Sequence, residues 1–375
     1  MKIKINKDKA YEVLGIVAKA VSSNCPTPAL SGIKIDASPD AITFTGSDAV
    51  KSIRVVLQND EECVDFTVED PGCVIIDAKY LLDIFKKLDS ETVSIEILDG
   101  TLTHFAGQKS QFKINGYRPK DYPSIQFDTP GTEFSISCEE LTEMISQVAI
   151  ACANKETRPV LTGVNIVSDG EQIKCVATDS FRLGKRILSV QTGKFNVTVP
   201  VKALNEIKGI FKPEDIITVS ANEREIVFRS GNTVLKSTLL DGNYPEVDHL
   251  IPTSFANYLI VDRKQLLSAI DRASFLKTDG LSLIRLEIAP GKDMTLSSHS
   301  SEIGDFQEPV SIILGEDKGI TVSFIGAYLT DALKALESDK VRISFNEAVK
   351  PFILTNEGSE EKDLIELVLP IRTFN

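Results

Sequence analysis

The sequence predicts an α+β fold of three tandem domains, each with two helices packed on one face of antiparallel sheet. The chain has 375 residues, which is too long for one typical domain. The same order of strand and helix patterns occurs three times, with a period of roughly 120 to 130 residues. That period is longer than a solenoid repeat, so each unit is expected to have its own core. The expected domains are residues 1–128, 129–252 and 253–375.

Each expected domain begins with an alternating strand that leads into a capped amphipathic helix. The strands are residues 1–5, 133–136 and 258–261. The residues that can accept a hydrogen bond from the free amides of the helix start are Asn6, Ser137 and Asp262. Glu140 and Gln265 follow the last two at the spacing of a capping box, so these positions mark helix starts.

A block of strands and a second helix follow in each domain. Residues 29–35 match residues 160–166 and, more loosely, residues 281–286. In the central copy, the turn at residues 168–170 reads Ser-Asp-Gly and separates two β-rich runs, which is the pattern of a hairpin. The second helices are expected at residues 77–88, 201–211 and 326–336. The closing hairpins are expected to pair residues 93–97 with 111–114, 217–220 with 226–239, and 341–345 with 352–355.

The composition is that of an ordinary soluble protein, with 42% hydrophobic and 25% charged residues. No apolar run reaches the ~20 residues of a membrane span, and the first residues alternate like a strand instead of opening a signal peptide. We therefore expect a cytoplasmic protein. The six cysteines include no Cys-x-x-Cys pair and the three histidines are scattered, so we expect buried reduced thiols, no metal site and no cofactor.

The formal net charge of −13 argues against a nucleic-acid partner until the distribution of charge is considered. The six expected helices together carry +5, which leaves −18 for the rest of the chain. Since the helices share one side of the sheets, this segregation predicts a positive face on an acidic body. Such a face would bind phosphates weakly and without sequence preference. The alternative is that lysines simply occupy the solvated faces of amphipathic helices.

Four segments, in their order along this triple repeat, resemble the bacterial DNA polymerase III β subunit, the sliding clamp family. These segments are residues 158–163, 177–183, 244–252 and 367–372. The resemblance covers the whole chain. It implies a homodimer in which two protomers close head to tail into a ring of six clamp domains, with helices lining the hole and sheets outside. It also implies a processivity factor that encircles double-stranded DNA and tethers the replicative polymerase.

The resemblance further implies a pocket between the second and third domains for short peptides of the DNA polymerase III α subunit, the clamp-loader δ subunit and other clamp-binding proteins. An apolar cleft at a domain junction suits an extended peptide with Leu or Phe anchors. The residues carried over to this pocket are Leu161, Thr178, Ser180, Phe181, Arg182, Leu183, Pro245, His249, Leu250, Ile325, Tyr328, Leu367, Val368, Leu369, Pro370, Ile371 and Arg372. Residues 367–371 are also expected to form a buried last strand.

The chain departs from the family in ways that predict a different partner preference. Many members have Gly-His where this chain has Ser180 and Phe181, and the chain continues for three residues past Arg372. Some members carry a DNA-contacting arginine where this chain has Asn24. The residues that the resemblance points to for DNA contact are Asn24, Lys79, Lys155, Arg158, Lys202, Arg263 and Lys264.

For the joints of the ring, the resemblance implies that Phe112 and Ile114 of one protomer meet Phe275 and Leu276 of the other. The alternative interpretation of these four residues is core packing within one chain. Only their burial distinguishes the two.

No enzyme motif is present: the sequence has no Gly-rich phosphate loop, no His-x-x-x-His and no Gly-x-Ser-x-Gly. A non-catalytic protein is therefore expected. Two alternatives stay open at this point. One is a metal-dependent nuclease or phosphatase built from distant carboxylates, and the other is a ring-shaped scaffold that binds peptides but no DNA.

Overall fold

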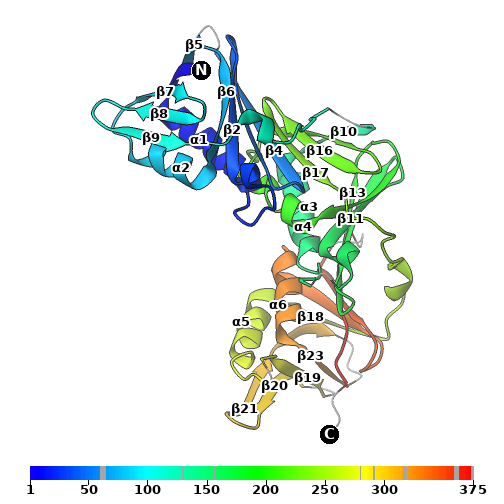
Figure 1. The fold of residues 1–375 in the computed structure, drawn as a ribbon. Coiled ribbons are helices and arrows are strands. Elements are labelled where there is room, and N and C mark those ends of the chain that lie inside the picture. The colour runs from blue at the N-terminus through cyan, green and yellow to red at the C-terminus, as the bar shows by residue number, and fades with distance from the viewer. Residues whose placement is uncertain are drawn as a thin grey trace. The chain divides into compact units, whose positions relative to one another are not determined.

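The computed structural model describes residues 1–59, 65–128, 131–155, 157–278, 280–289, 292–315, 319–358 and 363–372 (Figure 1). Cys63 and the tail after Arg372 lie outside these ranges. The chain forms two compact units. The first comprises Met1–Glu140 with Lys202–Leu239, and the second Leu141–Val201 with Leu240–Asn375. None of the described helices is long and apolar enough to cross a membrane.

The first unit contains two antiparallel sheets in its described residues. In spatial order, the five-stranded sheet consists of β5 (Phe66–Asp70), β1 (Lys2–Asn6), β7 (Thr92–Asp99), β8 (Leu102–Ala106) and β9 (Gln111–Asn115). The eight-stranded sheet consists of β10 (Thr132–Ser137), β15 (Ile216–Ala221), β16 (Glu225–Ser230), β17 (Thr233–Thr238), β4 (Lys51–Gln58), β3 (Ala41–Ser47), β2 (Gly32–Ala37) and β6 (Gly72–Asp77). Helices α1 (Lys7–Val17) and α2 (Ala78–Lys87) pack against each other and against these strands.

The second unit also has two antiparallel sheets among its described residues. The nine-stranded sheet consists of β14 (Phe195–Pro200), β11 (Gly163–Ser168), β12 (Gln172–Thr178), β13 (Arg182–Ser189), β26 (Leu364–Val368), β25 (Phe352–Asn356), β24 (Lys340–Phe345), β18 (Asn257–Asp262) and β22 (Ile312–Gly315). The four-stranded sheet consists of β21 (Gly304–Val310), β20 (Met294–Ser300), β19 (Leu283–Ile288) and β23 (Ile320–Ile325). Helices α5 (Arg263–Ala273) and α6 (Gly326–Ala335) pack together.

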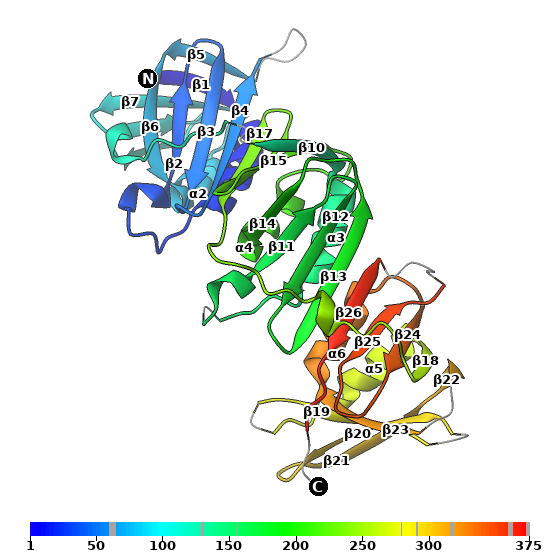
Figure 2. The ribbon, with the colours of Figure 1, turned by 90° about the vertical axis from the view of Figure 1, so that its right-hand side faces the viewer.

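Two of the sheets join strands from neighbouring predicted domains. In the eight-stranded sheet β17 pairs with β4, and in the nine-stranded sheet β13 pairs with β26 (Figure 2). The compact units therefore do not follow the repeat, and the three-domain boundaries stay a prediction.

The predicted helix starts are confirmed by the hydrogen bonds at their caps. The Asn6 side chain accepts from the Lys9 amide at 3.0 Å, and Asp262 accepts from the Gln265 amide at 2.7 Å. Ser137 Oγ accepts from the amide of Glu140 at 3.2 Å and donates to its carboxylate at 2.6 Å, which starts α3 (Cys138–Ala149). Each cap satisfies an amide that the helix itself leaves free.

The predicted helix at residues 201–211 is wrong as a single element. The structure has the short helix α4 (Val201–Leu204) and then a 3-10 turn, η5 (Ile207–Gly209). Amides in this segment bond to carbonyls three residues back, as from Glu206 to Ala203, which tightens the turn and ends the α-helix.

The matching blocks of the repeat do adopt the same local structure. Residues before Gly32 and Gly163 form the 3-10 turns η2 (Pro28–Ser31) and η4 (Pro159–Thr162), and a strand begins at each glycine. The predicted hairpin around residues 168–170 is confirmed, because Ser168 pairs with Ile173. The closing hairpin of residues 93–97 is a meander instead, in which β8 lies between β7 and β9.

Candidate functional site

Strand β13 is the point at which the predicted site residues meet. It pairs with β12 on one side, where Thr178 lies opposite Leu183, and with β26 on the other. The pairing with β26 places Arg182 opposite Val368 and Leu183 opposite Leu367. Two segments almost 200 residues apart in sequence thus become neighbours by backbone hydrogen bonding.

A tight turn precedes β13 and presents Phe181 to solvent. Asp179 Oδ1 accepts from the amides of Phe181 at 2.9 Å and Arg182 at 3.0 Å, and Thr178 Oγ1 donates to the carbonyl of Arg182 at 2.6 Å. Ser180 has a φ of 79°, in the left-handed region that glycine adopts more readily. With its backbone held in this way, the Phe181 side chain is 57% exposed.

Arg182 joins the turn to helix α6. Its Nε donates to Asp179 at 3.0 Å, its Nη1 donates to Asp331 at 2.6 Å, and its guanidinium lies 4.7 Å from the centre of the Tyr328 ring. The Asp179 and Asp331 carboxylates neutralise the cation, and the arrangement fixes its orientation. Arg182 therefore positions the site and is not a free charge for a ligand.

The C-terminal segment is fastened across the same region. The amide of Leu369 donates to the Phe181 carbonyl at 2.9 Å, and the amide of Ile371 donates to the Ser323 carbonyl at 2.7 Å. Leu369, Pro370 and Ile371 are half-buried beside the turn as a result. The prediction of a buried last strand over residues 367–371 is confirmed for Leu367 and Val368, which end β26, and is wrong for residues 369–371, which follow the strand and are half-buried.

Among the remaining predicted site residues Ile325 is half-buried, and the others are either buried in the core or exposed. Leu161, Leu183, Leu367 and Val368 lie in the core, with Leu367 only 4% exposed, so they support the surface instead of forming it. Leu161 lies in η4, and its carbonyl accepts from the amide of Ala153. Among the described residues, no backbone hydrogen bond joins Leu161 to the turn before β13. The exposed residues of the predicted set are Ser180, Phe181, Pro245, His249, Leu250 and Arg372.

The segment 244–250 packs over the sheet beside this turn. Tyr244 Oη accepts from the amide of Thr178 at 2.9 Å, and Val247 is buried in a cluster with Leu183 and Leu367. Burial raises the pKa of Tyr244, which keeps its hydroxyl neutral. Hydrogen bonds from Lys174 and Lys185 hold the pKa of Asp248 below its usual range and fasten the 3-10 turn η6 (Asp248–Leu250).

A buried carboxyl group lies under the site, and sequence reasoning missed it. Glu366 on β26 is 2% exposed, and its Oε1 has no hydrogen-bond partner among the described residues. Burial raises the pKa of Glu366 well above its usual value, while the charge of Arg182 opposes this effect and that of Asp331 adds to it. The signal was present as a single acid in the apolar run Leu364–Val368.

A second group of carboxyls connects α3 to the end of α6. Gln147 Nε2 donates to Glu143 at 3.1 Å and to Glu337 at 2.8 Å. The hydrogen bond between the two carboxyls, followed by burial, raises the pKa of Glu143. Two neighbouring carboxyls that share one proton favour the protonated form, which explains why the pKa of Glu143 is raised.

The residues predicted for DNA contact are mostly exposed. Arg263 is the exception, because its guanidinium donates to the carbonyls of Ser338 and Leu333 at the end of α6. Lys264 forms an ion pair of 3.3 Å with Asp339 at a fully solvated position. The exposed members of the set are Asn24, Lys79, Lys155, Arg158, Lys202 and Lys264.

The residues predicted for the ring joint differ sharply in exposure. Phe275 is 74% exposed, whereas its neighbour Leu276 is 5% exposed and packs within its own chain. Phe112 and Ile114 are half-buried on β9, the edge strand of the five-stranded sheet. β21 is likewise an edge strand, of the four-stranded sheet.

Among the described residues, no group of three or more His, Cys, Asp or Glu side chains could hold a metal ion. Burial raises the pKa of Cys152 and of Cys175 to about 12, so both thiols stay protonated.

Comparison with known proteins gives matches along the whole chain. Models of the N-terminal, central and C-terminal domains of the DNA polymerase III beta subunit match residues 1–126, 135–246 and 248–372. A beta sliding clamp of Bacillus subtilis is 36% identical over 382 residues, and one of Staphylococcus aureus is 34% identical over 379, each with both chains fully covered.

Solved structures agree with these matches. The crystal structure of the DNA polymerase sliding clamp from Bacillus subtilis has a TM-score of 0.96 at 35% identity, with 100% of both chains covered. That of the DNA polymerase III beta chain from Streptococcus pneumoniae has a TM-score of 0.94 at 31% identity, covering 99% of this chain and 100% of that one.

Proposed function

Because the chain belongs to the bacterial DNA polymerase III β sliding clamp family, we propose that two copies of it close head to tail into a ring around duplex DNA. As a member of this family the chain is a non-catalytic processivity factor of DNA polymerase III. DNA and the polymerase are accordingly its partners, and the nuclease or phosphatase alternative is set aside. The proposed domains are residues 1–128, 129–252 and 253–375, and the proposed location is the cytoplasm.

The proposed peptide site is the surface around Phe181, Leu369, Pro370 and Ile371. The observation that carries it is the β13 and β26 register, since this register brings the turn before β13 next to the C-terminal segment. The amides of Phe181, Leu369 and Ile371 and the Arg182 side chain are already bonded within the chain, and the side chains beside them are apolar. Such a surface suits the Leu or Phe anchors of an extended peptide. Proposed ligands are the α subunit of the polymerase, the clamp-loader δ subunit and other clamp-binding proteins.

The proposed ring joint uses the edge strands β9 and β21. β9 carries Phe112 and Ile114 at alternate positions, and a strand edge with free amides and carbonyls pairs readily with another chain. Phe275 of the second copy supplies a large exposed apolar side chain, while Leu276 supports it from inside that copy. Burial of Phe275 against the partner lowers the free energy of the closed dimer relative to two separate chains.

The proposed DNA contacts are weak and sequence-independent, from the exposed cations Lys79, Lys155, Arg158, Lys202 and Lys264. A ring holds DNA by topology, so it needs little affinity. The test is retention on DNA after loading by a clamp loader. The protein should stay on nicked circular DNA and leave after the circle is linearised. Equal retention on both forms would refute encirclement.

A further inference from the structure

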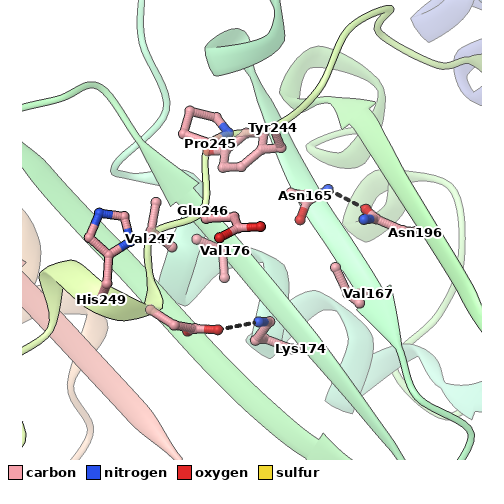
Figure 3. A pocket seen from close by; sticks show the side chains of 11 residues that line it. Asn165, Val167, Lys174, Val176, Asn196, Tyr244, Pro245, Glu246, Val247 and His249 are labelled. Carbon is pink, nitrogen blue, oxygen red and sulfur yellow. Dashed lines mark hydrogen bonds and ion pairs between the residues drawn. The ribbon is translucent and has the colours of Figure 1, made fainter.

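A pocket of about 450 Å³ lies on the face of the nine-stranded sheet, against the segment 244–249 (Figure 3). Its floor is formed by side chains that alternate with the core-facing ones along β11, β12 and β14. These floor residues are Asn165, Val167, Lys174, Val176 and Asn196. The pocket is distinct from the proposed peptide site around Phe181. Pro245 and His249 line this pocket and also belong to the peptide-pocket residues predicted from the sequence.

Asn165 presents a fixed hydrogen-bond acceptor to this pocket. The side chain is only 7% exposed, and its Nδ2 faces Asn196 Oδ1 at 2.8 Å, the Val197 carbonyl at 3.2 Å and Thr198 Oγ1 at 3.2 Å. Because the Val197 carbonyl can only accept a hydrogen bond, that end of the Asn165 amide is the NH₂ group. The oxygen therefore points away from Asn196, into the pocket, as Figure 3 shows.

Glu246 supplies a second acceptor, and a negative charge, from the opposite side. In Figure 3 its carboxylate extends over the floor of the pocket. Among the described residues Glu246 forms no ion pair. Lys174, which also lines the pocket, is bonded to Asp248 at 2.7 Å, and Lys185 is bonded to Asp248 at 2.8 Å. The pocket is thus lined by a carboxylate without an ion pair and by a buried amide oxygen, and a ligand that can satisfy both acceptors is a cationic donor.

The other walls are apolar and suit a methylene stem. The ring of Tyr244 and the side chains of Pro245, Val176 and Val247 line them. A long basic side chain can bury its stem on such walls while its charged head stays at the polar end. Arginine fits better than lysine, because its planar fork can donate to two separate acceptors.

We propose that this pocket binds the guanidinium group of an arginine that flanks the Leu or Phe anchors of a clamp-binding peptide. This inference rests on the proposed function, because Tyr244 separates the two sites: its ring lines the pocket and its Oη accepts from Thr178, next to the Phe181 turn. A peptide seated at Phe181 therefore needs only a short spacer to reach the pocket. Arginine next to the anchors becomes a determinant of partner choice.

The test compares three peptides in calorimetry with the full-length protein. Each peptide carries a Leu/Phe-rich anchor and, joined to it by a Gly-Ser spacer, an arginine, a citrulline or a lysine. The set of three is made twice, with the spacer at the N-terminal or at the C-terminal end of the anchor. Citrulline has the shape of arginine without its charge. For one of the two spacer positions, the arginine peptide should bind about tenfold tighter than the citrulline peptide, which corresponds to about 1.4 kcal/mol, with lysine in between.

The variant Glu246→Gln should abolish this preference while it leaves the affinity of the citrulline peptide unchanged. Glu223→Gln is the matched control, because it removes the same charge from an exposed position in the other compact unit. It should leave the preference intact. Persistence of the preference in Glu246→Gln, its loss in Glu223→Gln, or equal affinities of arginine and citrulline peptides would overturn the proposal.

A failure of the peptide site itself is recognised separately. If none of the peptides binds, N-acetyl-arginine methylamide alone tests the pocket. At millimolar concentration it should shift the side-chain amide resonances of Asn165 and Asn196, and its citrulline counterpart should not. Absence of that shift overturns the pocket assignment.

Discussion

Replacing the buried acid Glu366 with glutamine should stabilise the protein at neutral pH and change its response to pH. Glu366 lies where β26 pairs with β13. A Cβ placed on Gly184 of β13 would be 3.2 Å from Glu366 Oε1. The charged groups that act on it are Arg182, which favours the carboxylate, and Asp331, which opposes it. Burial outweighs Arg182, so the folded protein holds the proton more tightly than the unfolded chain does.

The sign and slope of the effect follow from proton linkage. Between the ordinary carboxyl pKa of about 4.3 and the raised pKa of the folded state, the folded protein binds more protons than the unfolded chain. Stability therefore falls as pH rises through this window, by up to about 1.4 kcal/mol for each pH unit. The amide of Glu366→Gln is neutral at every pH, so the variant does not lose stability in this way as pH rises. The two proteins should match near pH 4.5, and the variant should be increasingly more stable above it.

Thermal unfolding of both proteins in parallel from pH 5 to pH 8 measures this difference. A gain of 1 kcal/mol corresponds to about 2–4 °C in Tm for a unit of this size. All other titrating groups, including the Glu143 and Glu337 pair, are common to both proteins and cancel. Glu308→Gln is the control, because Arg272 holds the pKa of Glu308 below its usual value, so this variant should be less stable than wild type by a constant amount over this pH range. A constant offset between wild type and Glu366→Gln over this range would refute the assignment of Glu366 as a buried acid with a raised pKa.

Three further predictions concern the turn before β13 and the ring joint. Ser180→Gly should raise the free energy of unfolding by about 0.5 kcal/mol, since relief of a left-handed φ exceeds the added flexibility of the unfolded chain, and Ser180→Val should lower it by more than about 1 kcal/mol. Urea unfolding checks both, and equal midpoints would contradict them. Phe181→Ala should weaken a Leu/Phe-rich peptide about tenfold in calorimetry without changing Tm, because the side chain is mostly exposed. Unchanged affinity would remove Phe181 from the site. Phe275→Asp should give monomers in sedimentation, whereas Leu276→Asp should unfold the chain, and a persisting Phe275→Asp dimer would disprove the joint.

The repeat and its helix caps could be predicted because they are local. Asn6, Ser137 and Asp262 each accept from an amide three residues away, so the neighbouring sequence is enough to predict them. The helix at residues 201–211 was predicted wrongly although the contact that ends it is also local. Its helical pattern is intact, yet bonding between Glu206 and Ala203 replaces the α-helical ladder after one turn.

The site could be predicted only in part, because its assembly depends on long-range pairing. The resemblance named Arg182 and Leu367, but the register that places the two segments together joins residues far apart in the chain. Nothing local indicates that Asp331 would neutralise Arg182, or that Tyr244 would accept from Thr178. The sequence also cannot distinguish a residue that forms a surface from one that is buried beneath it. Phe275 and Leu276 are adjacent and both apolar, yet the first is exposed and the second is buried.

The internal pairing of charges determines what kind of partner this surface can select. Arg182 is ion-paired with two aspartates, and Asp248 with two lysines, so these charged side chains are already engaged within the chain. At the proposed peptide site around Phe181, affinity is then expected from apolar contact on a surface that is ordered before binding, which lowers the entropy lost on association. Apolar contact alone discriminates poorly between peptides with similar anchors. The unpaired carboxylate of Glu246 adds a charge requirement beside that surface, so a peptide with an arginine at the right spacing gains affinity that its anchors alone do not provide.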